Sequence, residues 1–350
     1  MNVSPAVMYP SVRQDVLRPQ LRLKQLDAMR GIAAIMVVVF HYTTRYVQLY
    51  GDQNHPGWQF PQGQYGVDFF FIISGFVIFL SLDNARNKWR FVSSRFWRLF
   101  PVYWAAVLLT WLLTSNVGLP GMTDGIGTFE LLANFAMFHQ YFYIPNIDGV
   151  YWTLALELAF YCWALVLYFH TDHRYTELIL VLWVSCGVVG AALFNLEGRE
   201  IPGVLEKLFL VNYSQLFAAG IVLFKIYRDG INSGRLMMLL FFSLVHWQTH
   251  GLIAFNVTVV AIVLILLSVH GGMRILESRL LLFFGAISYS LYLIHQEMGY
   301  ILINNLLDLG FTSSLAVLLS MLIAIAVATL LTYTIELPVL RWSRRRRSRN

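Results

Sequence analysis

Long apolar segments recur along the whole chain and are separated by short polar connections. A helix that crosses about 30 Å of hydrocarbon needs roughly 20 mainly apolar residues. On that basis we predict ten membrane-spanning helices, centred on residues 28–47, 64–82, 99–116, 150–170, 176–195, 207–226, 235–249, 252–269, 281–303 and 313–335. The seventh and eighth are short and only the sequence THGL separates them, which fits a hairpin or a partly re-entrant pair. Residues 129–143 are apolar but too few to span, which indicates an interfacial or re-entrant helix.

The composition favours a membrane protein over two soluble domains. Of the 350 residues, 58% are hydrophobic and 13% are charged, whereas about 25% of the residues in a soluble domain are charged. We therefore predict an all-α, polytopic helical bundle. Its single membrane domain is expected at residues 26–340, between a polar tail at 1–25 and a basic tail at 341–350. The first apolar segment begins near Ala28 and is long enough to span, so no cleaved signal peptide is expected.

The positive charges lie mainly on one predicted side of the membrane. Ten spans place both termini on the same side, and the positive-inside rule assigns that side to the cytoplasm. This side holds 22 of the 25 Lys and Arg residues, leaving Arg45, Arg199 and Lys207 on the other. The net charge of +6 includes the tail RWSRRRRSRN, which we interpret as an anchor to anionic membrane lipids and not as a nucleic-acid site.

Ionisable residues inside apolar segments are rare and costly, and for that reason they are candidate functional residues. The first segment contains Arg30 and His41, the second Asp68, the fourth Glu157 and the ninth His295. Arg30 and His41 are about three helical turns apart, so they share a helix face and lie about 16 Å apart along its axis. Arg30 can bind a cytosolic phosphate or carboxylate, and His41 can handle a proton deeper in the membrane. The alternative is that Arg30 only anchors the helix and His41 only forms a hydrogen bond between helices.

A second basic pair lies in the sequence RFVSSRFWRLFPVYW. Arg95 and Arg98 are three residues apart and therefore project from nearly one helix face. Two guanidinium groups in that arrangement can hold one phosphate. Anchoring at the inner interface is the alternative explanation for these arginines.

The histidine pattern argues against a metal site. The sequences HWQTH and HTDH each contain two closely spaced His residues, but the predicted topology places them on opposite sides of the membrane. Cys162 and Cys186 lie in apolar segments, and we expect neither a disulfide nor a cysteine-bound metal. The chain also lacks a glycine-rich phosphate loop and the GxSxG nucleophile elbow.

In their order along the chain, these motifs resemble those of the acyltransferase 3 family of integral membrane acyltransferases. LDAMRGIAAIMVVVFHY resembles its first-helix signature of Arg, ten residues and His, and GVDFFFIISGFVIFL is similar to its second-helix pattern. RFWRLFPVY, YWTLALELAFY and GAISYSLYLIHQ resemble later family motifs. The resemblance runs from Leu26 to His295. Ala28, Met29 and Thr153 depart from the usual Gly, Leu and Ser, and none of these departures removes a titratable group.

The resemblance implies O-acylation of an extracytoplasmic or lipid-linked carbohydrate, such as an exopolysaccharide or O-antigen, in a bacterial inner membrane. Acetyl-CoA would be the usual donor, as a co-substrate, and no cofactor would be bound permanently. Arg30, Arg95 and Arg98 would bind the phosphates of the donor at the cytoplasmic face. The carbohydrate acceptor would bind on the other side, where the loops are polar, acidic and aromatic. Glycan-assembly proteins are further expected partners.

The resemblance also implies that His41 is either a general base or a transient acyl carrier. Asp68 or Glu157 would orient its imidazole, as carboxylates do in catalytic triads, and the sequence does not distinguish between them. The structural alternatives are a solvated helix end for Asp68 and an interhelical hydrogen bond for Glu157. The expected supporting residues are Tyr292, His295 and Ser74.

A function from another class suits ten spans and buried charges equally well. The chain could be a transporter or flippase for a lipid-linked glycan or small solute. Paired spans interrupted by Gly or Pro in two related halves would favour that class, and the sequence shows none. A non-catalytic subunit of a glycan export complex is a third interpretation.

Overall fold

Helices form all the regular structure in the described part of the chain. The computed structural model describes residues 24–51, 56–85, 87–118 and 127–349, and within these ranges it contains no strand. The longer helices are α1 Lys24–Phe40, α3 Gly66–Asp83, α4 Lys88–Val117, α6 Trp152–Phe169, α7 Thr176–Leu196, α9 Ser214–Asp229, α10 Ser233–His250, α11 Leu252–Val269, α12 Arg279–Asp308, α13 Ser313–Leu331 and α14 Leu337–Arg349. The shorter helices are α2 Tyr46–Tyr50, α5 Thr128–Asn134, α8 Gly203–Phe209, η3 Pro61–Tyr65, η4 His139–Phe142, η5 Gly149–Tyr151, η6 His173–Tyr175 and η7 Arg274–Glu277. Two π-helical segments, η1 His41–Arg45 and η8 Thr332–Glu336, continue α1 and α13.

Eight helical segments of the described chain are long and apolar enough to cross a membrane. They are Lys24–Tyr50, Pro61–Asp83, Lys88–Val117, Gly149–Phe169, His173–Leu196, Gly203–Asp229, Leu252–Val269 and Ser313–Arg346. The prediction of an all-α, multi-pass membrane protein is therefore confirmed. The predicted seventh and ninth spans correspond to α10 and α12, which are helical but contain several polar residues and so fall outside this set. The count of ten spans and the cytoplasmic location of the termini stay predictions.

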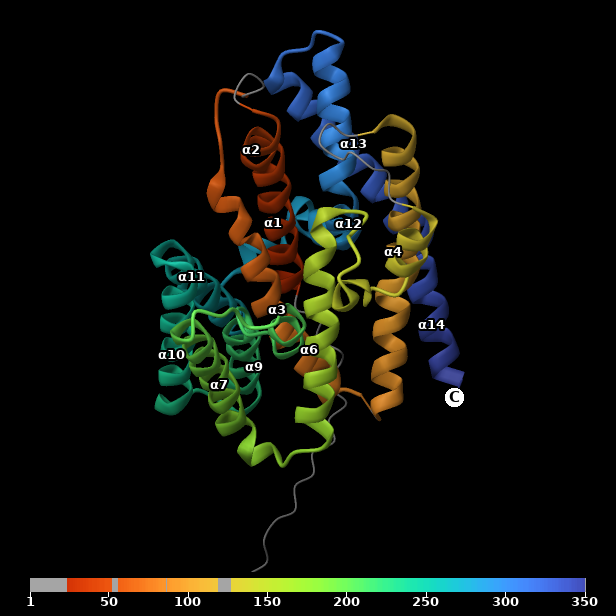
Figure 1. Ribbon diagram of the computed structural model, residues 1–350. Helices are drawn as coiled ribbons and strands as arrows, with labels where there is room; N and C mark the ends of the chain where they lie inside the picture. Colours follow the sequence, from red (N-terminus) through yellow and green to blue (C-terminus); the bar gives the residue numbers. More distant parts are fainter. Residues whose placement is uncertain (1–23, 52–55, 86, 119–126, 350) are drawn as a thin grey trace, which may run out of the picture.

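The helices form three neighbouring groups (Figure 1). In the middle, α1 packs against α12 and α3, although α12 is far from both in sequence. On one side lie α7, α9, α10 and α11, and α9 packs closely against α3. On the other side lie α4, α13 and α14. This arrangement places α12 at the centre of the bundle, where most of its polar residues from Ser288 to Glu297 are buried.

The structure defines the two segments that the sequence left open, residues 235–269 and 129–143. Gly251, with φ of 88°, connects α10 and α11 in a tight turn, and the two helices pack as a hairpin. Residues 129–143 form the short helices α5 and η4, which are too short to span. The Tyr103 hydroxyl on α4 donates a hydrogen bond of 2.6 Å to the carbonyl oxygen of Asn134 and so ties this segment to α4.

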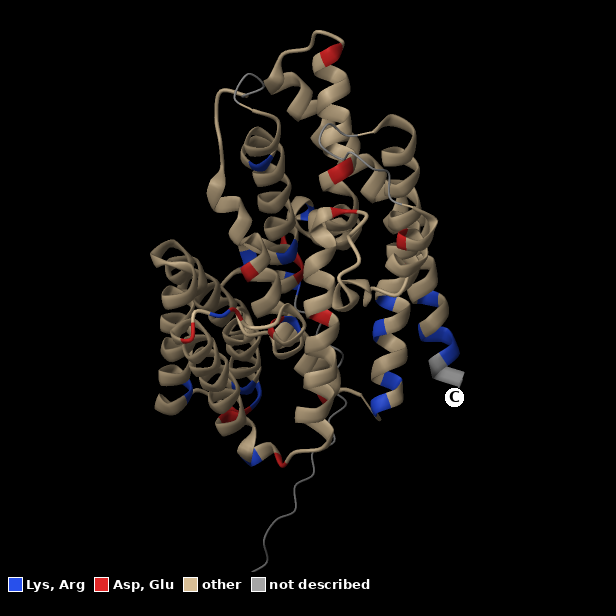
Figure 2. Cartoon of the chain, viewed as in Figure 1, with Lys and Arg blue, Asp and Glu red and all other residues tan. Residues whose placement is uncertain are grey.

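Basic residues gather toward one end of the bundle. Figure 2 shows them along the N-terminal half of α4, along α14 and near the turn between α9 and α10, at the lower end of the view. This distribution has the one-sided character that the positive-inside rule describes. The predicted basic tail continues α14 as helix through Arg349. Residues 1–23 of the predicted N-terminal tail lie outside the described residues.

Two helix crossings depend on glycine pairs. A Cβ atom on Gly31 of α1 would lie 2.5 Å from the backbone nitrogen of Gly285 of α12, and one on Gly285 would lie 2.2 Å from the carbonyl oxygen of Asp27. At the crossing of α3 and α9, a Cβ on Gly75 would lie 2.3 Å from the Phe217 carbonyl oxygen. Small residues permit such close backbone contact, which is a main source of helix association in membranes.

We predict that Gly75→Ala and Gly220→Ala each destabilise the fold by about 1–3 kcal/mol, because the added methyl group forces the backbones of α3 and α9 apart. A Cβ on Gly220 would lie 2.1 Å from the carbonyl oxygen of Ile72. Gly190→Ala on α7 is the matched control, since a Cβ there meets no atom within 4 Å. Thermal unfolding in detergent measures the effect. Equal unfolding midpoints for Gly75→Ala and Gly190→Ala would contradict the prediction.

Candidate functional site

Two predicted site residues of the first helical segment, Arg30 and His41, line two different pockets. Arg30 lies on α1, and His41 begins the π-helical segment η1. π-Helical turns are rare in proteins overall, and those that occur are often found at functional sites. Arg30 lines a pocket that we name the arginine pocket, and His41 lines a second one that we name the histidine pocket. The two residues share a helix but not a cavity.

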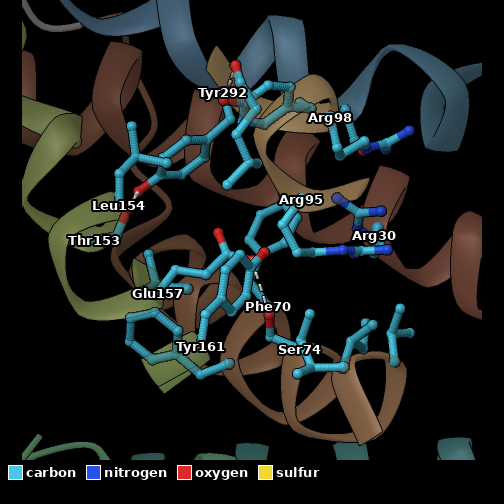
Figure 3. Close-up of a pocket in the computed structure, with 18 residues that line it drawn as sticks. Arg30, Phe70, Ser74, Arg95, Arg98, Thr153, Leu154, Glu157, Tyr161 and Tyr292 are labelled. Carbon is cyan, nitrogen blue, oxygen red and sulfur yellow. Dashed lines mark hydrogen bonds between the residues drawn. The ribbon is translucent and has the colours of Figure 1, made fainter. Parts of the chain in front are cut away.

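The arginine pocket has a volume of about 770 Å³ including its open mouth. Its walls come from α1, α3, α4, α6 and α12. Figure 3 shows the side chains of Arg30, Arg95 and Arg98 on one side of the pocket and Glu157 across from them. Its polar lining residues are Arg30, Ser74, Arg95, Arg98, Thr153, Glu157, Tyr161, Ser288, Tyr289 and Tyr292. The predicted donor-binding arginines are thus brought together around one cavity.

Glu157 is held within this pocket by two hydroxyl groups. Ser74 Oγ donates a hydrogen bond of 2.9 Å to Glu157 Oε1, and Tyr161 OH donates one of 2.6 Å to the same oxygen. Tyr161 lies one helical turn after Glu157, whereas Ser74 comes from α3. The carboxylate is therefore positioned to face the arginines.

The three arginines differ in how their charges are balanced. Arg98 Nη1 lies 3.1 Å from Oε1 of Glu336, which is almost fully buried in η8. Glu336 also accepts a hydrogen bond of 3.2 Å from Ser290 Oγ. Arg95 Nη2 lies 3.4 Å from Ser81 Oγ, its guanidinium also interacts with Tyr161, and its buried Nε has no hydrogen-bond partner within the described chain. Arg30 forms no ion pair with a described residue, so Arg30 and Arg95 have the greater capacity for an anionic ligand.

The histidine pocket is a separate cavity of about 850 Å³ including its opening. Its lining residues are Phe40, His41, Arg45, Gln48, Pro61, Gln64, Gly149, Trp152 and Gln296. The polar side chains among these nine are one imidazole, one guanidinium and three amides. One carboxylate, that of Glu157, lines the arginine pocket, and none from the described chain lines this one.

Hydrogen bonds assign the protonation of the two central histidines. His295 Nδ1 lies 2.9 Å from the carbonyl oxygen of Tyr292, which can only accept, so Nδ1 donates and Nε2 has a lone pair. His295 Nε2 lies 3.2 Å from His41 Nδ1, so it can accept a share of the single N–H of that nitrogen. His41 Nδ1 also lies 2.9 Å from the carbonyl oxygen of Val37. With both rings neutral, His41 Nε2 is unprotonated and can accept a proton from a molecule in the histidine pocket.

Tyr292 and His295 lie between the two pockets. Tyr292 lines the arginine pocket, and its hydroxyl is 2.9 Å from Thr153 Oγ1. Its ring centroid is 5.7 Å from that of His295, which in turn is 4.8 Å from that of His41. Of the predicted supporting residues, His295 is therefore adjacent to His41, Tyr292 is adjacent to His295, and Ser74 lies instead at Glu157.

The structure corrects the predicted partner of His41. Asp68 Oδ2 lies 3.0 Å from His246 Nε2, and His246 Nδ1 is 2.9 Å from Gln215 Nε2. Glu157 is bound to Ser74 and Tyr161, as described above. Neither carboxylate reaches His41, because Asp68 faces α9 and α10 and Glu157 faces the arginine pocket. His295 takes the position that was expected for a carboxylate.

Sequence reasoning missed several residues of these sites. Glu336 follows the last apolar segment and reads as a helix end, and only the π-helical segment η8 turns it into the bundle. His246 was visible in HWQTH, but its pairing with Asp68 depends on the packing of α10 against α9 and of α9 against α3. Trp152 and Gln296 lie within the motifs YWTLALELAFY and GAISYSLYLIHQ but were not predicted as site residues, and Arg45 lies outside every motif. Among the described residues, no group of three His, Cys, Asp or Glu side chains forms a metal site.

Comparisons with known proteins agree with the motifs. A family model described as an acyltransferase domain, acyltransferase 3, matches residues 23–335. The chain is 26% identical over 91% of its length to a protein of Komagataeibacter xylinus provisionally named membrane-bound transacylase BcsY, and the match covers 82% of that protein. It is 25% identical to acyltransferase MdmB of Streptomyces mycarofaciens, over 93% of this chain and 94% of that protein. A protein of Acidianus two-tailed virus, provisionally named acetyltransferase ORF330, is 22% identical over 79% of this chain and 84% of its own. No solved structure matches the chain.

We predict that imidazole ¹⁵N NMR of His41 shows a protonated Nδ1 and an unprotonated Nε2. His295→Ala removes the acceptor for Nδ1 and yields a mixture of both tautomers, because Val37 alone then selects between them. His270 is the internal control, since its Nδ1 lies 2.8 Å from the carbonyl oxygen of Leu266 and its ring is exposed. A protonated Nε2 on His41 in the wild-type protein would disprove the assignment.

Proposed function

The chain belongs to the acyltransferase 3 family, and from that premise we propose that it transfers an acetyl or larger acyl group from cytosolic acyl-CoA to a hydroxyl of an extracytoplasmic or lipid-linked carbohydrate. It is an acyl-transferring enzyme and an integral, multi-pass membrane protein. The observation that carries the finer proposal is that His41, whose Nδ1 lies against Val37 and His295, lines a pocket distinct from the arginine pocket. In this proposal the donor binds in the arginine pocket and the acceptor binds in the histidine pocket.

The arginine pocket suits the donor. The phosphates of acyl-CoA are anionic, and guanidinium groups bind phosphate with two parallel hydrogen bonds. Arg30 and Arg95 supply these donors, while Glu336 holds the Arg98 side chain in place. The predicted cytoplasmic side of these residues is the side on which acyl-CoA is available.

The proposed reaction takes place at His41. As a general base, Nε2 accepts the proton of the acceptor hydroxyl, whose oxygen attacks the thioester carbonyl carbon. The carbon–sulfur bond breaks, and the proton passes from His41 to the CoA sulfur. As an acyl carrier, Nε2 itself attacks the thioester carbonyl carbon, the carbon–sulfur bond breaks and CoA leaves as the thiolate. The acyl group then moves from nitrogen to the hydroxyl oxygen, which restores the neutral imidazole, and the hydroxyl proton is taken up by the thiolate.

His295 supports either form of the reaction. It accepts a hydrogen bond from His41 Nδ1 and so keeps Nε2 available. In a catalytic triad a carboxylate stabilises the protonated imidazole. Here a second imidazole fills that place, and its own Nδ1 is bound to the backbone of α12.

We predict that His41→Ala lowers acetyl transfer about 100- to 10,000-fold, the usual contribution of a general base. The measurement is transfer from labelled acetyl-CoA to glycan in proteoliposomes. His270→Ala is the control, because His270 has the same local backbone hydrogen bond but lies outside both pockets. Full glycan acetylation by His41→Ala would contradict the proposal. Movement of glycan across the membrane without release of CoA would favour a transporter.

The same preparation separates the two mechanisms. Without acceptor, an acyl carrier accumulates label on the His41 peptide, and the label is absent from His41→Ala. A general base accumulates none and releases CoA only when acceptor is present. Rapid quenching followed by peptide mass spectrometry distinguishes these outcomes.

We predict that Arg30→Gln and Arg95→Gln each raise KM for acetyl-CoA about tenfold or more, because each removes charge-assisted hydrogen bonds to phosphate. The effect on kcat is smaller, since neither side chain lines the histidine pocket. Arg174→Gln is the control, because Arg174 is exposed and paired with Asp172 at 2.7 Å. An unchanged KM for acetyl-CoA in both pocket variants would show that the donor binds elsewhere.

A further inference from the structure

Arg45 is a cation that neither the topology nor the proposed donor site explains. It ends the π-helical segment that His41 begins, and both side chains line the histidine pocket. It is one of three basic residues on the predicted outer side, where anchoring by the positive-inside rule does not apply. Arg199, another of the three, pairs with Glu197 at 3.3 Å. Arg45 instead donates to an amide oxygen, Gln48 Oε1, at 3.2 Å.

Although Glu297 forms hydrogen bonds with the lining residues Gln296 and Gly149, no carboxylate of the described chain lines the histidine pocket beside Arg45. Its other polar lining residues, apart from His41, are the amides of Gln48, Gln64 and Gln296. Arginine has five N–H donors and no acceptor, so a ligand oxyanion is its strongest complement here. Amides can both donate to and accept from sugar hydroxyls, and the Trp152 ring offers an apolar surface.

Gln296 is held in place at the base of this pocket. Its Nε2 donates a hydrogen bond of 3.1 Å to Glu297 Oε1. The backbone of Gly149 lies so close that a Cβ there would be 2.1 Å from Gln296 Nε2. The amide is thus fixed by its neighbours before a ligand arrives, which lowers the entropic cost of binding.

We propose that the acceptor is an acidic saccharide whose carboxylate or phosphate binds Arg45 while one of its hydroxyls lies at His41. This inference rests on the proposed function and names its substrate class. Arg45 is then the specificity-determining residue, and the three amides bind the neutral hydroxyls. A lipid headgroup phosphate offers Arg45 the same oxyanion chemistry, and the experiment separates the two sources.

The test measures how sugars protect His41 from diethylpyrocarbonate, which modifies an unprotonated imidazole nitrogen. The rate of His41 modification is followed by peptide mass spectrometry in an uncharged detergent. The two probes are methyl glucoside and methyl glucuronoside, which differ in one carboxylate. For the wild type, we expect half-maximal protection at a glucuronoside concentration at least about tenfold below that of the glucoside, the effect of one charge-assisted contact.

The variants test whether Arg45 causes this preference. Arg45→Gln should be protected equally by both sugars, and Arg45→Lys should keep part of the preference because it keeps charge but loses the planar fork. Arg199→Gln should keep all of it, since Arg199 lies outside the pocket. Protection is expressed relative to the same variant without sugar, so a change in intrinsic His41 reactivity does not enter.

Three results would overturn the inference. They are no protection of the wild type by glucuronoside, equal protection by both sugars, and a preference that survives in Arg45→Gln. Protection by added phosphatidylglycerol but not by glucuronoside would assign Arg45 to a lipid headgroup instead. The readout is independent of acyl transfer. If glucuronoside protects His41 but no glycan is acetylated, the proposed function fails while the assignment of the binding site stands.

Discussion

The contact between α1 and α12 is the constraint on which both pockets depend. Gly31 and Gly285 let the two backbones touch, and side chains larger than hydrogen would separate them. Further along the same crossing, Gly299 lies against the Tyr42 ring, and Tyr42 OH donates a 2.8 Å hydrogen bond to the carbonyl oxygen of His295. This close packing brings His41 within hydrogen-bond distance of His295. Without it, His41 Nδ1 would keep only the carbonyl oxygen of Val37 as a hydrogen-bond acceptor.

Burial at the centre of the bundle explains why α12 can be so polar. Polar groups exposed to lipid are costly, but the same groups are tolerated when other helices satisfy them. Ser290, Tyr292 and His295 all have hydrogen-bond partners on α12 itself or on neighbouring helices. The polarity that lowers the hydropathy of this helix is therefore the same property that builds the site.

Some charged side chains of the described membrane helices have a partner of opposite charge, and others do not. Arg98 is paired with Glu336 and Asp68 with His246, and removal of one partner from such a pair leaves a costly buried charge. Arg30 and Arg95 at one pocket and Arg45 at the other lack a carboxylate within salt-bridge distance among the described residues. Arg98 also lines the arginine pocket, but Glu336 balances its charge, so Arg30, Arg95 and Arg45 are the described cavity-lining cations without a carboxylate partner. That contrast is the physical basis for assigning ligands to the pockets.

The apolar pattern of the sequence determined the all-helical membrane fold, because segment length and composition set the spans before any packing occurs. It also identified Arg30, His41, Arg95, Arg98 and Glu157, since ionisable residues are conspicuous in apolar surroundings. Their partners could not be read in the same way. Local helix geometry relates residues three or four apart, whereas His295 is 254 residues from His41 and His246 is 178 from Asp68. Those pairings depend on which helices cross, at what depth and with what rotation, and only the tertiary packing decides that.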